Sequence, residues 1–245
     1  MDKLVTLESD VTREVMEMFV FPILKVLYYE DGSEIHKLIG TGFFIDNEGL
    51  FLTARHVFEG RGSALDLEGS KGYAVYCVHA VNMERKMVIR HIDVCSIKLR
   101  NDTDIAAGHV ENNQMFSSTT WISNKHLKQT GCLNLISIED IPEGTKIWTV
   151  AYPKTTIDPK KDDVVNINFV SEAYEGVITK HHPEYRDKGL LSWPCYETDM
   201  EIKGGASGGP VFISGSKGTL FAVNCAGTSP HSFSHVTSVV PLVPK

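Results

Sequence analysis

Short runs of β-forming residues, separated by turn residues along most of the chain, constrain the fold more than any other feature. The runs are rich in valine, isoleucine, phenylalanine and tyrosine, which strands favour, and Gly, Pro, Asn and Asp end most of them. The predicted strands are residues 21–30, 43–45, 50–57, 73–80, 87–97, 146–152, 164–170, 175–180, 209–213 and 219–225. Many short strands with distributed turn signals predict an all-β sandwich or barrel.

Three local segments refine this reading. Residues 43–57 predict a β-hairpin, because two apolar runs flank the turn residues 46–49. Residues 153–163 are mostly polar and predict a surface loop. One helix is expected near the N-terminus, where Ser9 or Asp10 is a candidate cap and residues 11, 15 and 19 share an apolar face.

Length and composition exclude several classes of protein. The chain has 245 residues, enough for one large domain, and a boundary at about residues 115–140 would divide 1–245 into two halves. No apolar run approaches the roughly 18 residues of a membrane helix. Residues 1–20 carry acidic side chains where a signal peptide is apolar. A net charge of −7 without a basic block argues against nucleic-acid binding.

The cysteines indicate the compartment. There are five of them, an odd number without close pairs, which is a poor disulfide framework and contains no CxxC metal motif. We therefore expect most of them to be small buried thiols, with no metal and a reducing, cytoplasmic location. Adjacent His181 and His182 are expected in a surface loop, because their side chains diverge on an extended segment and no third metal ligand is placed.

Three segments carry residues for nucleophilic catalysis. The first is TARHV (53–57), the second is DTDIAA (102–107) and the third is GGASGGP (204–210), which runs into a predicted strand. Their histidine, carboxylate and serine are the parts of a catalytic triad. His56 and Ser207 are the only members of their type in these segments, whereas Asp102 and Asp104 both qualify as the acid.

The glycines around Ser207 suit acyl transfer. A serine nucleophile needs a base that removes its proton, and the oxyanion that forms needs preorganised backbone N–H donors. A chain that turns sharply enough to aim two N–H groups at one point favours residues without a Cβ atom. We expect the N–H groups of Gly205 and Ser207 to form this oxyanion hole.

These segments resemble the trypsin-like serine peptidases with the chymotrypsin fold, especially their HtrA/Deg branch. GTGFFIDNEGLFLTARHV (40–57) is similar to the family's strand–turn–strand before its catalytic histidine, DTDIAAG (102–108) to its acid segment, and ETDMEIKGGASGGPVF (197–212) to its nucleophile segment. The resemblance implies two six-stranded antiparallel β-barrels with the site between them. It also implies a serine endopeptidase, without a cofactor, in which His56 is the base, Asp104 the acid and Ser207 the nucleophile.

Two departures from the family pattern bear on regulation. Ala206 stands where secreted digestive members place an aspartate that pairs with a newly cut N-terminus. Activation by N-terminal cleavage is therefore not expected, and the oxyanion loop must be ordered intrinsically, by substrate or by a regulatory protein partner. HtrA/Deg proteins usually carry a PDZ domain after the protease, and none is expected within the 245 residues.

The substrate pocket has two readings. Glu201 lies six residues before Ser207, where trypsin-like enzymes place the base of the primary pocket, and a carboxylate there would favour Arg or Lys in a protein or peptide substrate. In the HtrA/Deg pattern this position is small and the pocket apolar, and Glu201 would then face solvent. Asn224, Cys225 and Ala226 are expected to form a pocket wall.

Two alternatives to a peptidase stay open. A catalytically silent protease-fold protein would bind a partner through the same scaffold, although a scaffold has no need of the three triad residues. An esterase of the α/β-hydrolase type fits less well, because its triad order differs and the Gly205–Gly209 segment runs into Pro210 and a strand instead of a helix.

Overall fold

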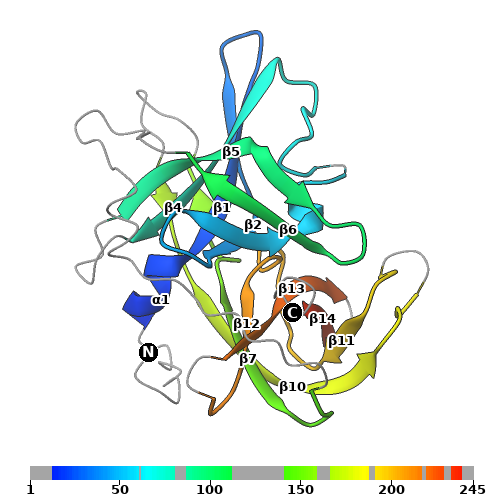
Figure 1. Cartoon of the computed structure of the whole chain (residues 1–245). Helices are drawn as coiled ribbons and strands as arrows, with labels where there is room; N and C mark the ends of the chain where they lie inside the picture. The colour runs from blue at the N-terminus through cyan, green and yellow to red at the C-terminus, as the bar shows by residue number, and fades with distance from the viewer. Residues whose placement is uncertain are drawn as a thin grey trace.

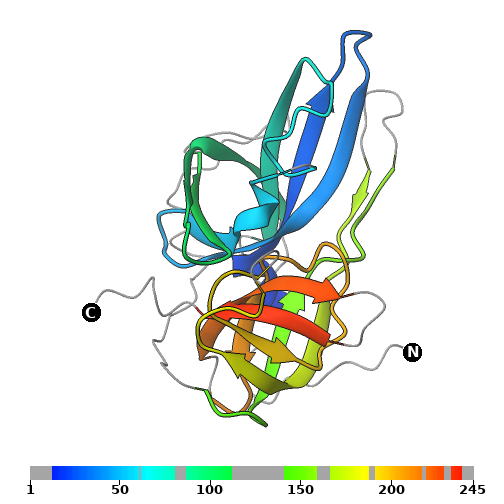
Figure 2. The same ribbon diagram turned by 90° about the vertical axis from the view of Figure 1, so that its right-hand side faces the viewer.

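The computed structural model describes residues 13–60, 62–80, 87–111, 141–158, 166–187, 191–216, 219–228 and 233–238. These residues form a short helix and two closed antiparallel β-barrels (Figure 1). The first barrel comes from the N-terminal half and lies above the second in Figure 2. The prediction of an all-β, double-barrel fold is confirmed. The predicted boundary at 115–140 lies outside the described residues.

The first barrel closes through six strands. Around the barrel they are β1 (Val20–Tyr28), β2 (Glu34–Phe44), β3 (Leu50–Ala54), β6 (Ile105–Val110), β5 (Met87–Leu99) and β4 (Gly72–Ala80). The predicted hairpin is confirmed, because β2 pairs with β3 and Phe43 lies opposite Leu52. A turn of 3-10 helix, Arg55–Val57, follows β3.

The second barrel also closes through six strands. In order they are β10 (Glu172–His182), β11 (Cys195–Thr198), β14 (Phe233–Ser238), β13 (Leu220–Thr228), β12 (Pro210–Ile213) and β7 (Lys146–Ala151). A separate two-stranded sheet pairs β8 (Thr156–Ile157) with β9 (Ile167–Asn168). The expected loop at 153–163 was therefore wrong in part, since β8 lies within it.

The helix α1 (Arg13–Phe19) forms near its predicted position. Its candidate caps and Val11 lie outside the described residues, but Met16 and Phe19 are buried in the apolar core. With seven residues α1 depends on this packing, because isolated helices of that length are not stable in water. No helix within the described ranges is long and apolar enough to cross a bilayer.

One apolar cluster continues from the first barrel into the second. It joins first-barrel side chains such as Phe21, Phe43 and Ile105 to Trp148, Tyr152 and Phe212 of the second half. The rings of Trp148 and Phe212 stack with centroids 4.2 Å apart. A smaller cluster around Ile147, Tyr196 and Phe221 fills the second barrel. The barrels therefore share buried surface at their junction.

Candidate active site

The pairing of β3 with β6 brings His56 next to Asp104. Ala54 lies opposite Ile105 in this register, so the residue that precedes β6 meets the 3-10 turn that follows β3. His56 Nδ1 lies 2.8 Å from Asp104 Oδ2, and the backbone N–H of His56 donates to Asp104 Oδ1 at 3.1 Å. The Asp104 side chain is 3% exposed, whereas 46% of the His56 side chain is exposed. A buried carboxylate thus orients an accessible imidazole.

Asp102, the other candidate acid, has a different environment. Its carboxylate is exposed and pairs with the Arg100 guanidinium through Nε at 2.9 Å and Nη2 at 2.7 Å. The hydrogen bond from Arg100 lowers the pKa of Asp102. Of the two carboxylates, only Asp104 contacts His56 among the described interactions.

Ser207 lies in a pair of consecutive β-turns before β12. The N–H of Ala206 donates to Lys203 O at 3.1 Å, and the N–H of Gly209 donates to Ala206 O at 3.1 Å. The third residue of each turn is a glycine with positive φ, +89° at Gly205 and +90° at Gly208. Type II turns require this conformation at that position, which explains the glycine pattern. We call residues 203–209 the oxyanion turn.

The oxyanion turn of the second barrel contacts the first barrel close to His56. The N–H of Thr41 in β2 donates to Ser207 O at 2.8 Å. A Cβ atom on Gly40 would lie 3.0 Å from Ser207 O and 2.6 Å from Val57, the residue after His56. The structure therefore brings the three triad candidates to the junction of the barrels.

The two expected oxyanion donors are available. Among the described hydrogen bonds, the N–H groups of Gly205 and Ser207 donate to no acceptor, while the neighbouring N–H groups of Ala206, Gly208 and Gly209 all do. Unpaired N–H groups two residues apart at a solvent-accessible turn are the arrangement that an oxyanion hole requires.

The hydrogen bond described for the Ser207 hydroxyl is not to His56. It runs to the backbone carbonyl of Cys225, with Oγ and O 3.4 Å apart. Cys225 lies at a register shift of β13, between Asn224 and Ala226. The candidate base and acid are thus in contact, whereas the described hydrogen bond of the candidate nucleophile is to a backbone carbonyl.

The four residues expected at the substrate pocket occupy different environments. Glu201 is exposed, before the oxyanion turn. Asn224 is fully buried, and its Nδ2 donates to Thr149 Oγ1 at 2.8 Å and to Ala206 O at 3.4 Å. Cys225 is also buried, which raises the pKa of its thiol well above the usual value. Ala226 lies in β13 opposite His235.

The described cysteines and the two adjacent histidines occupy structural positions in the fold. Cys77, Cys95, Cys195 and Cys225 are free thiols, and Cys132 lies outside the described residues. His181 and His182 lie at the end of β10 and not in the expected surface loop, because both continue its pairing with β11. No group of three metal-ligating side chains occurs in the described part of the chain.

A buried lysine supports the loop that follows His56. Lys25 of β1 is fully buried, and its ammonium group donates to Ser63 O at 2.7 Å, to Asp66 O and to Glu68 Oε1 at 3.1 Å. The N–H of Ala64 in the same loop donates to Val57 O at 2.7 Å. The loop, called here the Lys25 loop (62–70), is thereby attached to the 3-10 turn that carries His56. Sequence reasoning did not identify this lysine.

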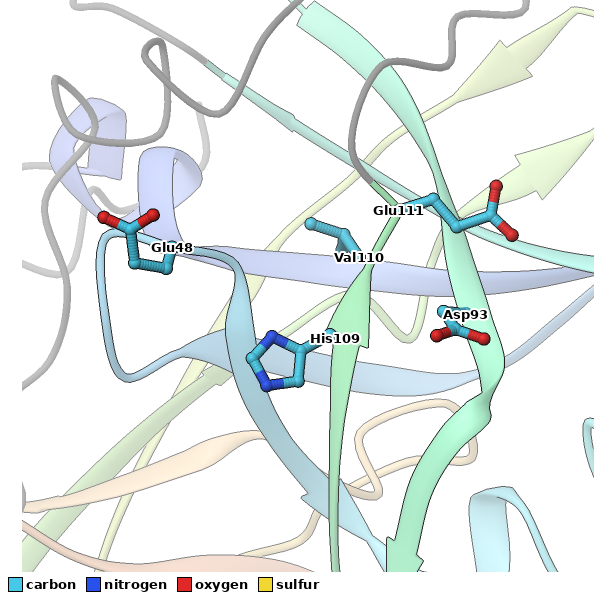
Figure 3. A pocket seen from close by; sticks show the side chains of 5 residues that line it. All are labelled: Glu48, Asp93, His109, Val110 and Glu111. Atoms are coloured by element: carbon cyan, nitrogen blue, oxygen red, sulfur yellow. The ribbon is translucent and has the colours of Figure 1, made fainter.

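A cavity of about 370 Å³ lies elsewhere on the first barrel. Figure 3 shows its lining by Glu48, Asp93, His109, Val110 and Glu111. His109 lies opposite Leu50 at the start of β3, whereas His56 follows the other end of that strand. This acidic cavity is therefore separate from the candidate active site.

Comparisons with solved structures find the same fold. Deg5 has a TM-score of 0.58 and 18% identity over 90% of this chain and 84% of its own. The HtrA-type protease AlgW, solved with a decapeptide, has a TM-score of 0.58 and 13% identity over 92% of this chain. The serine endoprotease from Yersinia pestis has a TM-score of 0.54 and 13% identity over 96% of this chain. This chain spans 63% of AlgW and 65% of the Yersinia chain.

Sequence comparison identifies the family directly. No curated protein sequence matches this chain significantly. The sequence profile of the trypsin-like peptidase domain, however, matches residues 40–223, most of both barrels and the segments that carry His56, Asp104 and Ser207. With the double-barrel fold and its HtrA and Deg structural neighbours, this match shows that the chain belongs to the trypsin-like peptidase domain family.

Proposed function

We propose that the protein is a serine endopeptidase that hydrolyses peptide bonds through Ser207, His56 and Asp104. The observation that carries the proposal is the junction of the barrels. There a histidine that is hydrogen-bonded to a buried carboxylate lies near the oxyanion turn, which contains Ser207. That turn presents the unpaired N–H groups of Gly205 and Ser207. No cofactor is required by this chemistry.

The first half of the reaction forms an acyl-enzyme. The Asp104 carboxylate accepts from His56 Nδ1–H, which leaves the Nε2 lone pair as the base. Ser207 Oγ bonds to the scissile carbonyl carbon as its proton moves to Nε2, and the carbonyl π electrons move onto oxygen. The N–H groups of Gly205 and Ser207 stabilise this oxyanion. Its collapse breaks the C–N bond, and His56 returns the proton to the leaving amine.

The second half repeats these steps with water. His56 removes a proton from water, whose oxygen bonds to the acyl carbon. Collapse of this second tetrahedral intermediate breaks the ester bond, and the proton on His56 restores the Ser207 hydroxyl. Every proton therefore passes through one imidazole, so the accessibility of His56 serves both halves.

The hydrogen bond from Ser207 to Cys225 O favours a second candidate, a protein that binds peptides without cleaving them. A rotation about the Cα–Cβ bond of Ser207 would move its hydroxyl from Cys225 O toward His56. A partly exposed serine makes such a rotation within picoseconds to nanoseconds. The candidates differ in whether His56 can then engage the hydroxyl.

Substrate, partner and location form the finer part of the proposal. AlgW was solved with bound peptides, which supports a peptide substrate for a chain of the same fold. Glu201 is exposed, which fits the reading in which it faces solvent and the primary pocket is apolar, so we propose a small apolar residue before the cut. A regulatory protein partner would act on the oxyanion turn. The free thiols of the described cysteines support a reducing location such as the cytoplasm.

The test combines a fluorophosphonate probe with a peptide library. We expect the probe to modify Ser207 and the library to be cleaved with enrichment of small apolar residues before the cut, whereas enrichment of Arg or Lys would place Glu201 in the pocket. Ser207→Ala should lose both, with turnover lower by roughly 10⁶-fold, as found for a comparable triad. Ser214→Ala, a serine in the same region away from the turn, is the matched control. A wild type that binds library peptides but neither cleaves them nor reacts would establish the non-catalytic candidate.

A further inference from the structure

We propose that Thr41, acting from the first barrel against Asn224 of the second, positions the oxyanion turn and so makes the oxyanion hole preorganised. The inference rests on the proposed function, and it answers how the turn is ordered when Ala206 stands where an ion-pairing aspartate would be. Neither residue contacts the reacting atoms, so both are positioning residues and not catalytic ones.

The direction of an oxyanion donor is set by the carbonyl of its own peptide unit. In a planar trans peptide the N–H and C=O bonds point in opposite directions. The Ser207 N–H shares its peptide with Ala206 O, so an acceptor contact that fixes this carbonyl also aims the N–H. The carbonyls of residues 205 and 207 belong to the peptide units on either side of the Ala206–Ser207 unit. Contacts that hold these two carbonyls therefore restrict rotation of the unit between them, and with it the direction of the Ser207 N–H.

Asn224 holds the carbonyl that matters most for Ser207. Its Nδ2 donates to Ala206 O at 3.4 Å, beside the turn hydrogen bond from the Gly209 N–H. The same Nδ2 donates to Thr149 Oγ1 at 2.8 Å, and Thr149 Oγ1 donates to Pro210 O at 2.7 Å. The Asn224 backbone adds two bonds, from Gly208 N–H at 2.8 Å and to Gly209 O at 2.9 Å. Hydrogen bonds from the second barrel thus hold the turn on one side.

Thr41 holds the carbonyls on both sides of Ala206. Its hydroxyl donates to Gly205 O at 2.8 Å, and its backbone N–H donates to Ser207 O at 2.8 Å. The hydroxyl oxygen accepts from Tyr152 N–H at 3.3 Å, and Thr53 Oγ1 donates to Thr41 O at 2.7 Å. Hydrogen bonds from the first barrel hold the turn on the other side.

The polar side chains of this network are fully buried. Thr41, Thr53, Thr149 and Asn224 each have 0% exposure. Buried hydrogen bonds compete less with water, and a buried polar group that loses its partner is costly. The hydroxyl of Thr41 therefore determines the direction of the Gly205 carbonyl. Valine has nearly the same shape but no hydroxyl, so Thr41→Val should leave this carbonyl without its hydrogen bond.

The experiment compares Thr41→Val, Thr41→Ser and the control Thr198→Val by steady-state peptide cleavage. Thr198 is equally buried, and its hydroxyl bonds to Ser234 Oγ at 2.8 Å, away from the turn. We expect Thr41→Val to lower kcat about 10- to 100-fold with little change in KM, less than the ~10²–10³-fold that loss of an oxyanion donor costs. Thr41→Ser should restore most of the rate, and Thr198→Val should keep it.

A second readout follows the oxyanion itself. A peptide aldehyde forms a tetrahedral adduct with Ser207. The peptide of the same sequence with a C-terminal amide in place of the aldehyde binds without forming an adduct. Thr41→Val should weaken the aldehyde by the same factor as kcat and leave the amide unchanged, which a purely structural loss would not do. Equal weakening of both ligands, or a kcat within twofold of wild type, would overturn the positioning role.

Hydrogen exchange separates the inference from the proposed function. If wild type cleaves no peptide, the proposed function fails, and the inference is judged on the backbone amides of 203–209. Faster exchange there in Thr41→Val, but not in Thr198→Val, supports Thr41 as the residue that orders the turn. Unchanged exchange overturns it, whatever the activity.

Discussion

The acid–base half and the nucleophile half of the site are built in different ways. His56 and Asp104 belong to one barrel, and the β3–β6 register places them in contact before any substrate arrives. Ser207 belongs to a glycine-rich turn whose carbonyls are held from both barrels, and its hydroxyl bonds to Cys225 O. The comparison teaches that strand pairing fixes the histidine–carboxylate pair, whereas the position of the serine depends on the junction between the barrels.

Apart from removal of the Ser207 hydroxyl itself, the largest effect should come from breaking the acid–base half. Asp104→Asn replaces a carboxylate that accepts from His56 Nδ1 with an amide that favours the wrong imidazole tautomer. We expect kcat to fall by about 10⁴-fold, the loss known for the equivalent change in another triad enzyme. Asp102→Asn, which alters an exposed carboxylate on Arg100, should leave kcat nearly unchanged. Steady-state kinetics of both variants checks this, and equal losses would mean that Asp104 is not the acid.

A second change breaks the junction that holds the nucleophile half. Gly208 has a φ of +90°, and a Cβ atom there would collide with Thr41 O and Thr53 Oγ1 and lie 2.9 Å from Ala54 N. Because two of these are backbone atoms, Gly208→Ala should lower the free energy of unfolding by about 3 kcal/mol through strain and overpacking.

The control for that change separates strain from collision. Gly215 also has positive φ, +75°, but a Cβ atom there has no neighbour within 4 Å. Gly215→Ala should therefore cost about 1 kcal/mol, from backbone conformation alone. Denaturant titration of both variants gives the difference, and a Gly208→Ala loss no larger than that of Gly215→Ala would contradict the tight junction.

The smallest effect concerns the response of the barrels to acid. His79 of the first barrel is fully buried, and burial lowers its pKa to about 3. Burial also lowers the pKa of His235 in the second barrel, to about 4. Each folded pKa lies below the ordinary value of about 6.5, so the unfolded chain binds more protons as the pH falls. The contribution of these two histidines to the free energy of unfolding is therefore fully present above pH ~6.5 and is lost progressively toward pH 4.

His79→Asn tests the first-barrel share of this dependence. An asparagine amide can replace the hydrogen bond from Nδ1 to Ala80 O at 3.0 Å and does not titrate. The variant should lose up to about 2 kcal/mol less stability than wild type between pH 7 and pH 5. His109→Gln, at an exposed histidine of the same barrel, should follow wild type. Urea titrations at both pH values decide, and parallel losses in all three proteins would exclude His79.

The sequence predicts the parts of the fold and site that depend on local pattern. The hairpin before His56, the strands rich in β-branched residues and the three catalytic segments are each readable from a few neighbouring residues. Strands β6, β8, β11 and β14 were missed. β6 (IAAGHV) contains alanine and glycine, which strands disfavour, and β14 (FSHVTS) contains serine and threonine side chains that are buried.

The supports of the site were harder to predict because they join distant segments. Thr41 and Gly205 are 164 positions apart, and Asn224 meets Ala206 only after β12 and β13 pair. The glycines beside Thr41 and the buried position of Asn224 gave the available signal, but polar residues in apolar strands have many structural roles. The partner of Lys25, likewise, is a loop about 40 positions away, mostly its backbone carbonyls, which leave no mark in the sequence.

Lys25 has a consequence for how the site responds to its surroundings. The ammonium group that donates to Ser63 O, Asp66 O and Glu68 belongs to a side chain of β1. The fold itself therefore holds this cation next to the loop. Its burial also shields it from dissolved salt. The attachment of the loop to the turn that carries His56 should therefore depend little on the ionic strength of the solution.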